Sequence, residues 1–190
     1  LGGVLVYPPL GGGTATQRCL DEGQAGLAGL GLVPDIISTG GTPNLVNMDH
    51  LEGATEHRAG TCIFNDRMMM AAGVADGEAC ALTIFTSVVS RAGAARGILD
   101  AGSKTFTADT GGLDGFGLIL EHTAARIHKM AEEHGFLDLS ACAVKPDIGD
   151  ILRVIPNHVC VAVNMFDQLV AVRGNSIVDV LPVAARGPVV

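Results

Sequence analysis

The sequence of 190 residues has no tryptophan, one tyrosine and only 4% aromatic residues. With 26 glycines beside them, this composition suits tight turns and close approach of backbone to ligands more than large aromatic stacking surfaces. Basic residues are also few, since 12 Lys and Arg stand against 20 Asp and Glu, with a net charge of −8 and no basic run. This balance argues against a nucleic-acid partner and against an anionic membrane surface.

Two further absences bear on location. No apolar run approaches the roughly 18 residues that a membrane span needs, so we expect a soluble protein. The cysteines are odd in number, widely spread and never spaced as CxxC, which argues against a disulfide scaffold and for a reducing, cytoplasmic compartment. No signal peptide is visible, and because the sequence opens on Leu1 in a strand-like run, we expect that it belongs to a longer protein. The cysteines are Cys19, Cys62, Cys80, Cys142 and Cys160.

Apolar residues make up 48% of the chain, enough for a sizeable core. The first fifty residues predict a buried strand over residues 2 to 7, a helix from about 14 to 30, and a second buried strand in "PDIIST" that ends at "GGTPN". Strand, helix and strand in this order form a parallel βαβ unit. The helix residues expected to face inward are Ala15, Cys19, Leu27 and Leu30.

The pattern changes after residue 44, where short apolar runs separated by turn residues predict an antiparallel β domain. The segment "NDRMMMAAG" is expected to interrupt it as a helix, and "ARIHKMAEEHG" reads as helix or as strand. We therefore place a domain boundary near residue 50, with an α/β part over 1–50 and a β-rich part over 51–190. The predicted strands are "TCIFN", "ACALTIFTSVVS", "GILDAG", "DILRVIP", "HVCVAVNMF", "QLVAVRG" and "SIVDVLPV".

The segment "STGGTPN" follows the second predicted strand and carries candidates for anion binding. Its two glycines would allow backbone N–H groups to face a phosphate, and Ser38, Thr39 and Thr42 could add hydroxyl donors. A plain strand-ending loop is the alternative, because Gly-Gly is common punctuation between elements.

The segment "HVC" places His158 and Cys160 two residues apart in a predicted strand, where both side chains would project from one face. Imidazole and thiolate together suit Zn²⁺, and a site with only two protein ligands would keep positions open for water or substrate. A hydrogen-bonded histidine beside an ordinary buried cysteine is the alternative.

Three other segments carry polar residues. Lys104 in "LDAGSK" is one of three lysines and is a conceivable Schiff-base residue, although a solvated lysine is the ordinary interpretation. The segments "EHRAG" and "EEHG" pair an acid with a histidine, and both read equally well as polar turns.

Taken in order, these motifs resemble the D-threonine aldolase and D-serine dehydratase-like family of pyridoxal-phosphate (PLP) enzymes, which have the alanine-racemase fold. The resemblance extends from about residue 3 to 187, and its most specific elements are "PNHVC" and the terminal "VAARG". It implies a mixed α/β fold, in which the last strands of a PLP-binding (β/α)₈ barrel are followed by an antiparallel β-rich C-terminal domain.

The resemblance also implies cofactors and partners. Gly40, Gly41 and Thr42, together with Ser38, are similar to the loop that binds the PLP phosphate, and Tyr7 is a further candidate for contact with the cofactor. The β domains of this family complete the active site of a partner subunit, which implies a homodimer that acts on a small D-amino acid.

His158 and Cys160 match the divalent-metal ligands of the family. Aldolases of the family often carry Asp at the second position, so Cys160 resembles the dehydratase branch and favours Zn²⁺, with Mn²⁺ or Mg²⁺ as alternatives.

The chain departs from the family at several positions. The Schiff-base lysine of the family lies in a part of the barrel that this sequence does not contain, and Lys104 matches a β-domain position, so this chain alone is expected to be inactive. Cys62 stands where the family often has Tyr, and "YPPL" lacks a Gly-His that the family carries after the first strand.

The sequence analysis therefore predicts a PLP- and metal-dependent lyase for D-β-hydroxy amino acids, with D-threonine aldolase-like cleavage to glycine and an aldehyde as the first hypothesis. The alternative is a D-serine or 3-hydroxyaspartate dehydratase, which releases a keto acid and ammonia. An amino-acid racemase of the same fold, or a non-catalytic β domain, are further alternatives, the second because the Schiff-base lysine is absent.

Overall fold

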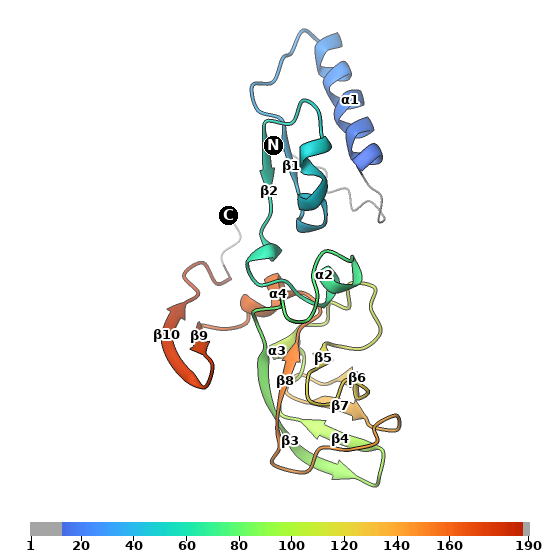
Figure 1. Cartoon of the computed structure of the whole chain (residues 1–190), viewed down its shortest axis with the longest axis vertical. Helices are drawn as coiled ribbons and strands as arrows, with labels where there is room; N and C mark the ends of the chain where they lie inside the picture. The colour runs from blue at the N-terminus through green and yellow to red at the C-terminus, as the bar shows by residue number, and fades with distance from the viewer. Residues whose placement is uncertain (1–12, 188–190) are drawn as a thin grey trace. The chain divides into compact units, whose positions relative to one another are not determined.

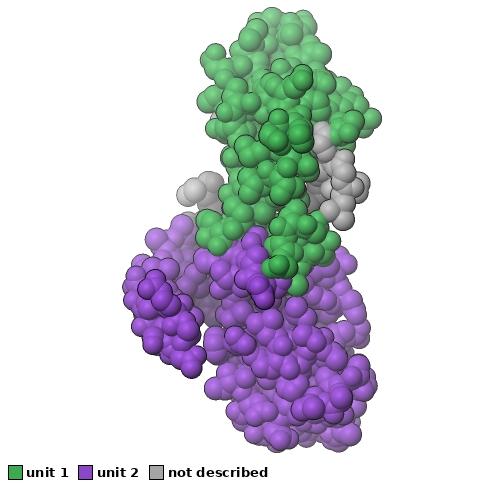
Figure 2. Space-filling view, viewed as in Figure 1, with its two compact units in different colours: residues 1–63, 69–76 green, residues 64–68, 77–190 purple. Residues whose placement is uncertain are grey.

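The computed structural model describes residues 13–187, so the strand predicted over residues 2 to 7 and the candidate Tyr7 lie outside the described residues. The chain divides into two compact units, one of residues 1–63 and 69–76 and the other of residues 64–68 and 77–190 (Figure 2). The domain boundary near residue 50 stays a prediction.

Unit 1 begins with helix α1 (Gly13–Gly29), as predicted. The inward positions expected in and just after α1 are wrong for three residues, because Cys19 is exposed and Leu27 and Leu30 are 38% and 77% exposed. The helix is attached mainly through Gln17, whose amide donates to the Glu52 carbonyl over 3.1 Å and accepts the Glu52 N–H over 2.8 Å. Its apolar side chains therefore gain little cover from the described part of unit 1.

The rest of unit 1 consists of short elements. Strands β1 (Ser38–Gly40) and β2 (Glu56–Arg58) pair in parallel over three residues, and 3₁₀ helices η1 (Thr42–His50) and η2 (Thr61–Ile63) follow them. The buried strand predicted in "PDIIST" is wrong in extent, since only its last two residues belong to β1 and Ile36 is 68% exposed. The strand predicted in "TCIFN" is also wrong, because those residues begin with η2.

Unit 2 is built on a six-stranded antiparallel sheet (Figure 1) in the order β5-β8-β3-β4-β7-β6. The sheet nearly closes into a barrel, because the N–H of Phe116, just before β5, donates to the carbonyl of Ile127 on β6 over 3.0 Å. A separate antiparallel hairpin follows. The strands are β3 (Ile84–Ala92), β4 (Arg96–Leu99), β5 (Leu118–Ile119), β6 (Arg126–Met130), β7 (Gly135–Asp138), β8 (Ile151–Ile155), β9 (Gln168–Arg173) and β10 (Ser176–Pro182).

The core of unit 2 fills this near-barrel with the inward residues of each strand. Ile84, Val88 and Leu99 belong to it, and Leu152 and Val154 of β8 are at most 1% exposed. Burial alternates along β3 and β8, as a period of two requires. Each fully buried aliphatic side chain contributes about 1.5–3 kcal/mol to stability. These side chains therefore hold the strands of unit 2 together.

Three short helices complete the described chain, namely α2 (Arg67–Ala71), α3 (Ser103–Phe106) and α4 (Val159–Val163). The strands predicted in "ACALTIFTSVVS", "GILDAG", "DILRVIP", "QLVAVRG" and "SIVDVLPV" are confirmed, as is the strand option for "ARIHKM". The helix expected in "NDRMMMAAG" is confirmed by α2, whereas the strand expected in "HVCVAVNMF" is wrong and is replaced by α4. Within residues 13–187, no helix is long and apolar enough to cross a membrane.

Candidate active-site residues

His158 lies in the turn between β8 and α4, directly before the helix. Figure 1 labels both elements. Its backbone is extended, with φ −133° and ψ 112°, and the next five residues form the helix that contains Cys160. The expectation that His158 and Cys160 share one face of a strand is therefore wrong. Strand β8 ends at Ile155, where its pairing with β5 stops, so the β-branched residues that follow have no neighbouring strand to pair with.

The imidazole of His158 lies against a buried carboxylate. Its Nδ1 is 3.0 Å from Oδ2 of Asp66, a residue that is 0% exposed. The same Oδ2 accepts the backbone N–H of Val159 over 2.9 Å, at the start of α4. The Asp66 carboxylate therefore fixes both the imidazole ring and the helix that carries Cys160.

The Cys160 side chain also interacts with the imidazole of His158. The hydrogen bond to Asp66 and, next, the one to Cys160 outweigh the opposing effect of burial and raise the pKa of His158 to about 10. Cys160 is exposed, whereas the His158 side chain is 18% exposed. The helical turn thus brings together the pair that the sequence analysis expected, through a different local structure.

An open hollow of about 500 Å³ adjoins Cys160. Thr107 lines it with φ 63° and ψ 176°, a backbone conformation that glycine adopts and that β-branched residues rarely do. The hollow gives Cys160 access to a small molecule. The residues that line it are Thr107, Asp109, Cys160, Val161, Asn164 and Met165.

The side chain of Asn157 links the loop of residues 110–117 to the turn that carries His158. Its side-chain oxygen accepts the N–H of Gly117 over 2.9 Å and Nη1 of Arg67 over 3.0 Å. Its side-chain nitrogen donates to the carbonyls of Thr110 and Gly115 over 3.3 and 2.8 Å. Asn157 is 3% exposed and has every hydrogen-bonding position occupied, so it holds the turn in one conformation.

His158 and Cys160 suit a divalent metal of the Zn²⁺ type. An imidazole nitrogen and a thiolate are ligands that such ions accept, and a carboxylate behind the imidazole is the usual outer partner of a ligating histidine. Within the described residues, no group of three or more His, Cys, Asp or Glu side chains is arranged to hold a metal ion. Among the described residues, the pair would therefore supply two ligands to such an ion and leave the remaining positions open.

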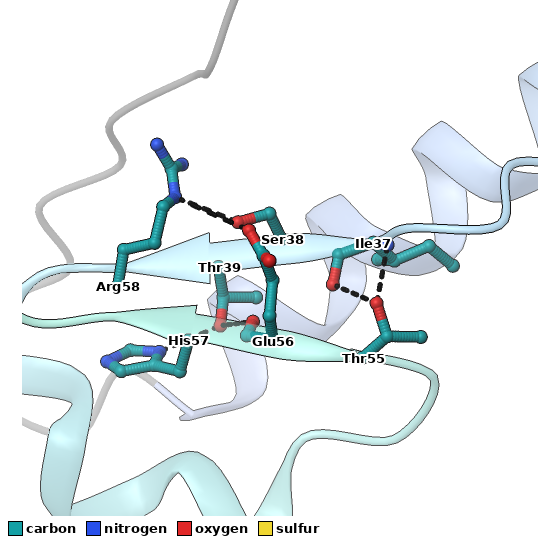
Figure 3. Close-up of polar contacts among 7 residues, drawn as sticks. All are labelled: Ile37, Ser38, Thr39, Thr55, Glu56, His57 and Arg58. Atoms are coloured by element: carbon teal, nitrogen blue, oxygen red, sulfur yellow. Dashed lines mark hydrogen bonds and ion pairs between the residues drawn. The ribbon is translucent and has the colours of Figure 1, made fainter.

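The second candidate site extends from β1 to the first residue of η1 in unit 1. Figure 3 shows the polar contacts of the β1–β2 pair beside it. Ser38 and Arg58 lie on one face of the β1–β2 pair, where Nε of Arg58 donates to the Ser38 hydroxyl over 2.8 Å. Gly40 lies close to β2, since an added Cβ would be 3.1 Å from the Arg58 carbonyl. Gly41 has φ 95°, which favours glycine. The two glycines are thus explained by the turn itself.

Thr39 and His57 lie on the other face of this strand pair (Figure 3). The two ring nitrogens of His57 contact the Thr39 hydroxyl over 2.8 Å and the Gly41 carbonyl over 3.2 Å. Because a carbonyl can only accept, Nε2 carries a proton and donates to Gly41. The Thr39 hydroxyl lies between Nδ1 of His57 and the Glu56 carbonyl, which is 3.3 Å away. His57 therefore fixes the Gly41 turn, and "EHRAG" is a strand end with a defined partner.

The segment has a donor set that fits a phosphate group. The hydroxyl oxygens of Ser38 and Thr42 each accept a hydrogen bond, from Arg58 and from the N–H of Cys62 over 3.0 Å, so their protons remain available to an anion. Arg58 adds positive charge on the side of Ser38.

The segment "LDAGSK" is explained by structure. Asp100 accepts the Thr86 hydroxyl over 2.6 Å and the Ser87 N–H over 2.8 Å. Lys104 lies 3.0 Å from Glu133, and the hydrogen bond to this carboxylate, with a second to Glu132, raises the pKa of Lys104. Lys104 thus stays a cation at neutral pH and is a poor nucleophile.

Sequence reasoning missed three residues of these sites. Asp66 is 92 residues before His158, and the sequence "FND" carries no periodic signal that pairs the two. His57 and Arg58 were noticed only as part of a polar turn. A signal for them exists in the parallel pairing of residues 38–40 with 56–58, but these strands are too short to recognise in the sequence.

Solved structures with a similar fold identify the structural class of the chain. A solved alanine-racemase-like protein from Idiomarina loihiensis superposes with a TM-score of 0.75 at 21% identity, over 90% of this chain and 50% of that chain. Two solved mutants of D-threo-3-hydroxyaspartate dehydratase superpose with TM-scores of 0.77 and 0.74 at 25% and 26% identity, over 91% and 90% of this chain and 50% of theirs. One replaces a cysteine by alanine and is in the metal-free form, and the other replaces a histidine by alanine. The described fold is thus that of the C-terminal half of alanine-racemase-like proteins.

Sequence comparison gives the family. The family model described as "Putative serine dehydratase domain" matches residues 81–172. An uncharacterized protein of Mycobacterium tuberculosis is 41% identical over 112 residues, which cover 56% of this chain and 84% of that protein. D-threonine aldolase of an Arthrobacter species is 35% identical over 162 residues, 83% of this chain and 41% of the aldolase. The chain belongs to the D-threonine aldolase and D-serine dehydratase-like family and corresponds to its C-terminal portion. It spans about half or less of the length of the named enzymes.

Proposed function

We propose that the complete protein is a PLP- and metal-dependent lyase for D-β-hydroxy amino acids, with D-threonine aldolase-like cleavage as the first candidate. The observation that carries the proposal is the His158–Cys160 pair, backed by the buried carboxylate of Asp66 and open to a hollow. Named relatives include an aldolase and a dehydratase that act on substrates of this kind.

The dehydratase mutants support the metal assignment. The histidine and the cysteine replaced in those two proteins lie two positions apart, the same spacing as His158 and Cys160, and the cysteine mutant is in the metal-free form. This coincidence supports a metal bound by the same pair of residue types here. The cysteine ligand favours Zn²⁺ over harder ions such as Mg²⁺.

Each unit holds candidate residues for one cofactor, and the two sets are taken separately. When bound, PLP supplies an electron sink at the substrate Cα and the metal supplies a Lewis acid for the β-hydroxyl. Ser38, Thr42 and Arg58 would bind the phosphate through hydroxyl protons and charge. His158 and Cys160 would hold the metal, and the hollow beside Cys160 leaves room for a substrate hydroxyl.

The products separate the two branches. We expect the complete protein, supplied with PLP and Zn²⁺, to release acetaldehyde and glycine from D-threonine. Pyruvate from D-serine, or oxaloacetate from D-3-hydroxyaspartate, would instead assign it to the dehydratases. If none of these substrates is consumed, the lyase proposal is wrong, and chelator-resistant racemization of alanine would favour a racemase.

A second candidate function is a metal-binding module without lyase activity. The match to the mycobacterial protein covers 84% of its length, so sequence of this kind also occurs in a short chain with little besides it. Such a module would bind Zn²⁺ through His158 and Cys160 but release no product from any D-amino acid. Metal binding and turnover measured on the same preparation therefore distinguish the two functions.

A further inference from the structure

Asp66 is a fully buried carboxylate, with 0% of its surface exposed. A buried carboxylate is costly unless hydrogen-bond donors compensate it. Nδ1 of His158 and the backbone N–H of Val159 are among its partners, and both contact the same oxygen, Oδ2. This oxygen is therefore directed at the turn that carries the candidate metal ligands.

These contacts decide which nitrogen of His158 can bind a metal. Nδ1 lies 3.0 Å from Asp66 and is occupied, so Nε2 is the nitrogen left for an ion. The bond to Val159 sets the first residue of α4 and therefore the start of the helical turn on which Cys160 follows. One oxygen atom thus orients both ligands.

Asp66 is itself held in place by its neighbours in the chain. The N–H of Arg67 donates to the Pro156 carbonyl over 3.1 Å, and the N–H of Met68 donates to the Asn157 carbonyl over 3.1 Å. The segment that leads from Asp66 into α2 is therefore fixed by backbone hydrogen bonds, independently of the carboxylate. A substitution confined to the Asp66 side chain would leave these bonds in place.

We propose that Asp66 is the positioning residue of this site, which makes His158 and Cys160 competent to bind a divalent metal. It holds the ring with Nε2 toward the ion and makes the imidazole a stronger ligand. With the Cys160 thiolate it brings two negative charges, which match a doubly charged cation. The inference rests on the proposed metal site and adds a residue that acts through His158.

The test compares Zn²⁺ affinity of the 190-residue chain and of variants, measured by calorimetric titration with zinc alone. Asp66→Asn keeps an oxygen that can accept the Val159 N–H but removes the charge. We expect it to bind Zn²⁺ about 10- to 100-fold more weakly with an unchanged circular dichroism spectrum. With Co²⁺ in place of Zn²⁺, the same variant should show shifted visible bands, which report ligand geometry.

Asp100→Asn is the matched control, because Asp100 also accepts one side-chain and one backbone hydrogen bond in unit 2 but lies outside the site. It should bind Zn²⁺ as the unmodified chain does. Cys160→Ser gives the level of binding without the site. Unmodified affinity and spectrum in Asp66→Asn would overturn this inference while leaving the metal site intact. If the unmodified chain binds no better than Cys160→Ser, the metal proposal itself is wrong.

Discussion

Gly102 lies where α3 begins, against the turn of residues 131–134. The N–H groups of Ser103 and Lys104 donate to the carbonyls of Ala131 and Glu132, each over 2.9 Å. A Cβ added to Gly102 would lie 2.3 Å from the Ala131 carbonyl oxygen and 2.5 Å from the His134 nitrogen. The absence of a side chain at this position thus allows two backbone segments to meet.

At the scale of the residue, we expect Gly102→Ala to lower the free energy of unfolding of unit 2 by about 1–3 kcal/mol or more, because neither backbone segment can move away cheaply. Urea titration followed by circular dichroism measures the loss. Gly60→Ala is the control, since a Cβ there meets nothing within 4 Å and should change stability little. Equal stability of the two variants would contradict the packing argument.

The residues of the site were partly predictable. His158 and Cys160 could be proposed because their chemistry is rare and their spacing is short, whereas Asp66 could not, because its contact depends on how the chain returns after 92 residues. The glycines of "GGT" were noticed for phosphate binding, yet Gly40 and Gly41 are required locally by the close approach of β2 and by a positive φ. The chemistry of a side chain can be read from the sequence, whereas the contacts that explain its presence often depend on distant parts of the chain.

At the scale of the element, helix α1 contains glycines that its packing does not require. A Cβ added to Gly23 or Gly26 meets nothing within 4 Å. We expect Gly23→Ala and Gly26→Ala to stabilise α1 by about 0.5–1 kcal/mol each, because alanine loses less backbone entropy on folding. Amide exchange within α1 should slow accordingly. Gly31→Ala should have the opposite effect, since Gly31 has φ 72°, and slower exchange in that variant would argue against this explanation.

Elements with a period of two, such as β3 and β8, were predictable because one face of each strand packs in the core and the other is exposed or partly exposed. The run from Val159 to Val163 has the same β-branched composition but forms α4. Its first N–H is capped by Asp66 and it lies beyond the end of the sheet, so tertiary contacts override the local preference. Short strands such as β1 and β5 carry too few residues to show a pattern.

At the scale of the whole molecule, several carboxylates of unit 2 couple stability to pH. Hydrogen bonds from Thr86 and Ser87 outweigh the effect of burial and leave the pKa of Asp100 lowered. Burial raises the pKa of Glu121, but the hydrogen bonds from Arg153 outweigh this effect and leave the pKa lowered. The charged forms therefore favour the folded state, and their contribution is present above the ordinary pKa values of about 4 and is lost as pH falls below them.

We accordingly expect the chain to unfold at lower urea concentration as pH falls below about 4, with little change between pH 5 and 7 from these groups. The midpoint of urea unfolding at each pH measures this dependence. Asp100→Asn should be less stable at neutral pH and should lose part of the acid dependence. An unchanged slope below pH 4 in that variant would show that Asp100 does not contribute.

The measurement that tests the central claim most directly is the absorption spectrum of the chain loaded with Co²⁺. A cobalt ion bound by Cys160 and His158 should show a near-ultraviolet thiolate-to-metal charge-transfer band. The account predicts that this band disappears in Cys160→Ser, weakens in His158→Ala and persists in Cys142→Ser, whose cysteine is buried in the core. A band that persists unchanged in Cys160→Ser would contradict the account, because the metal would then be held elsewhere.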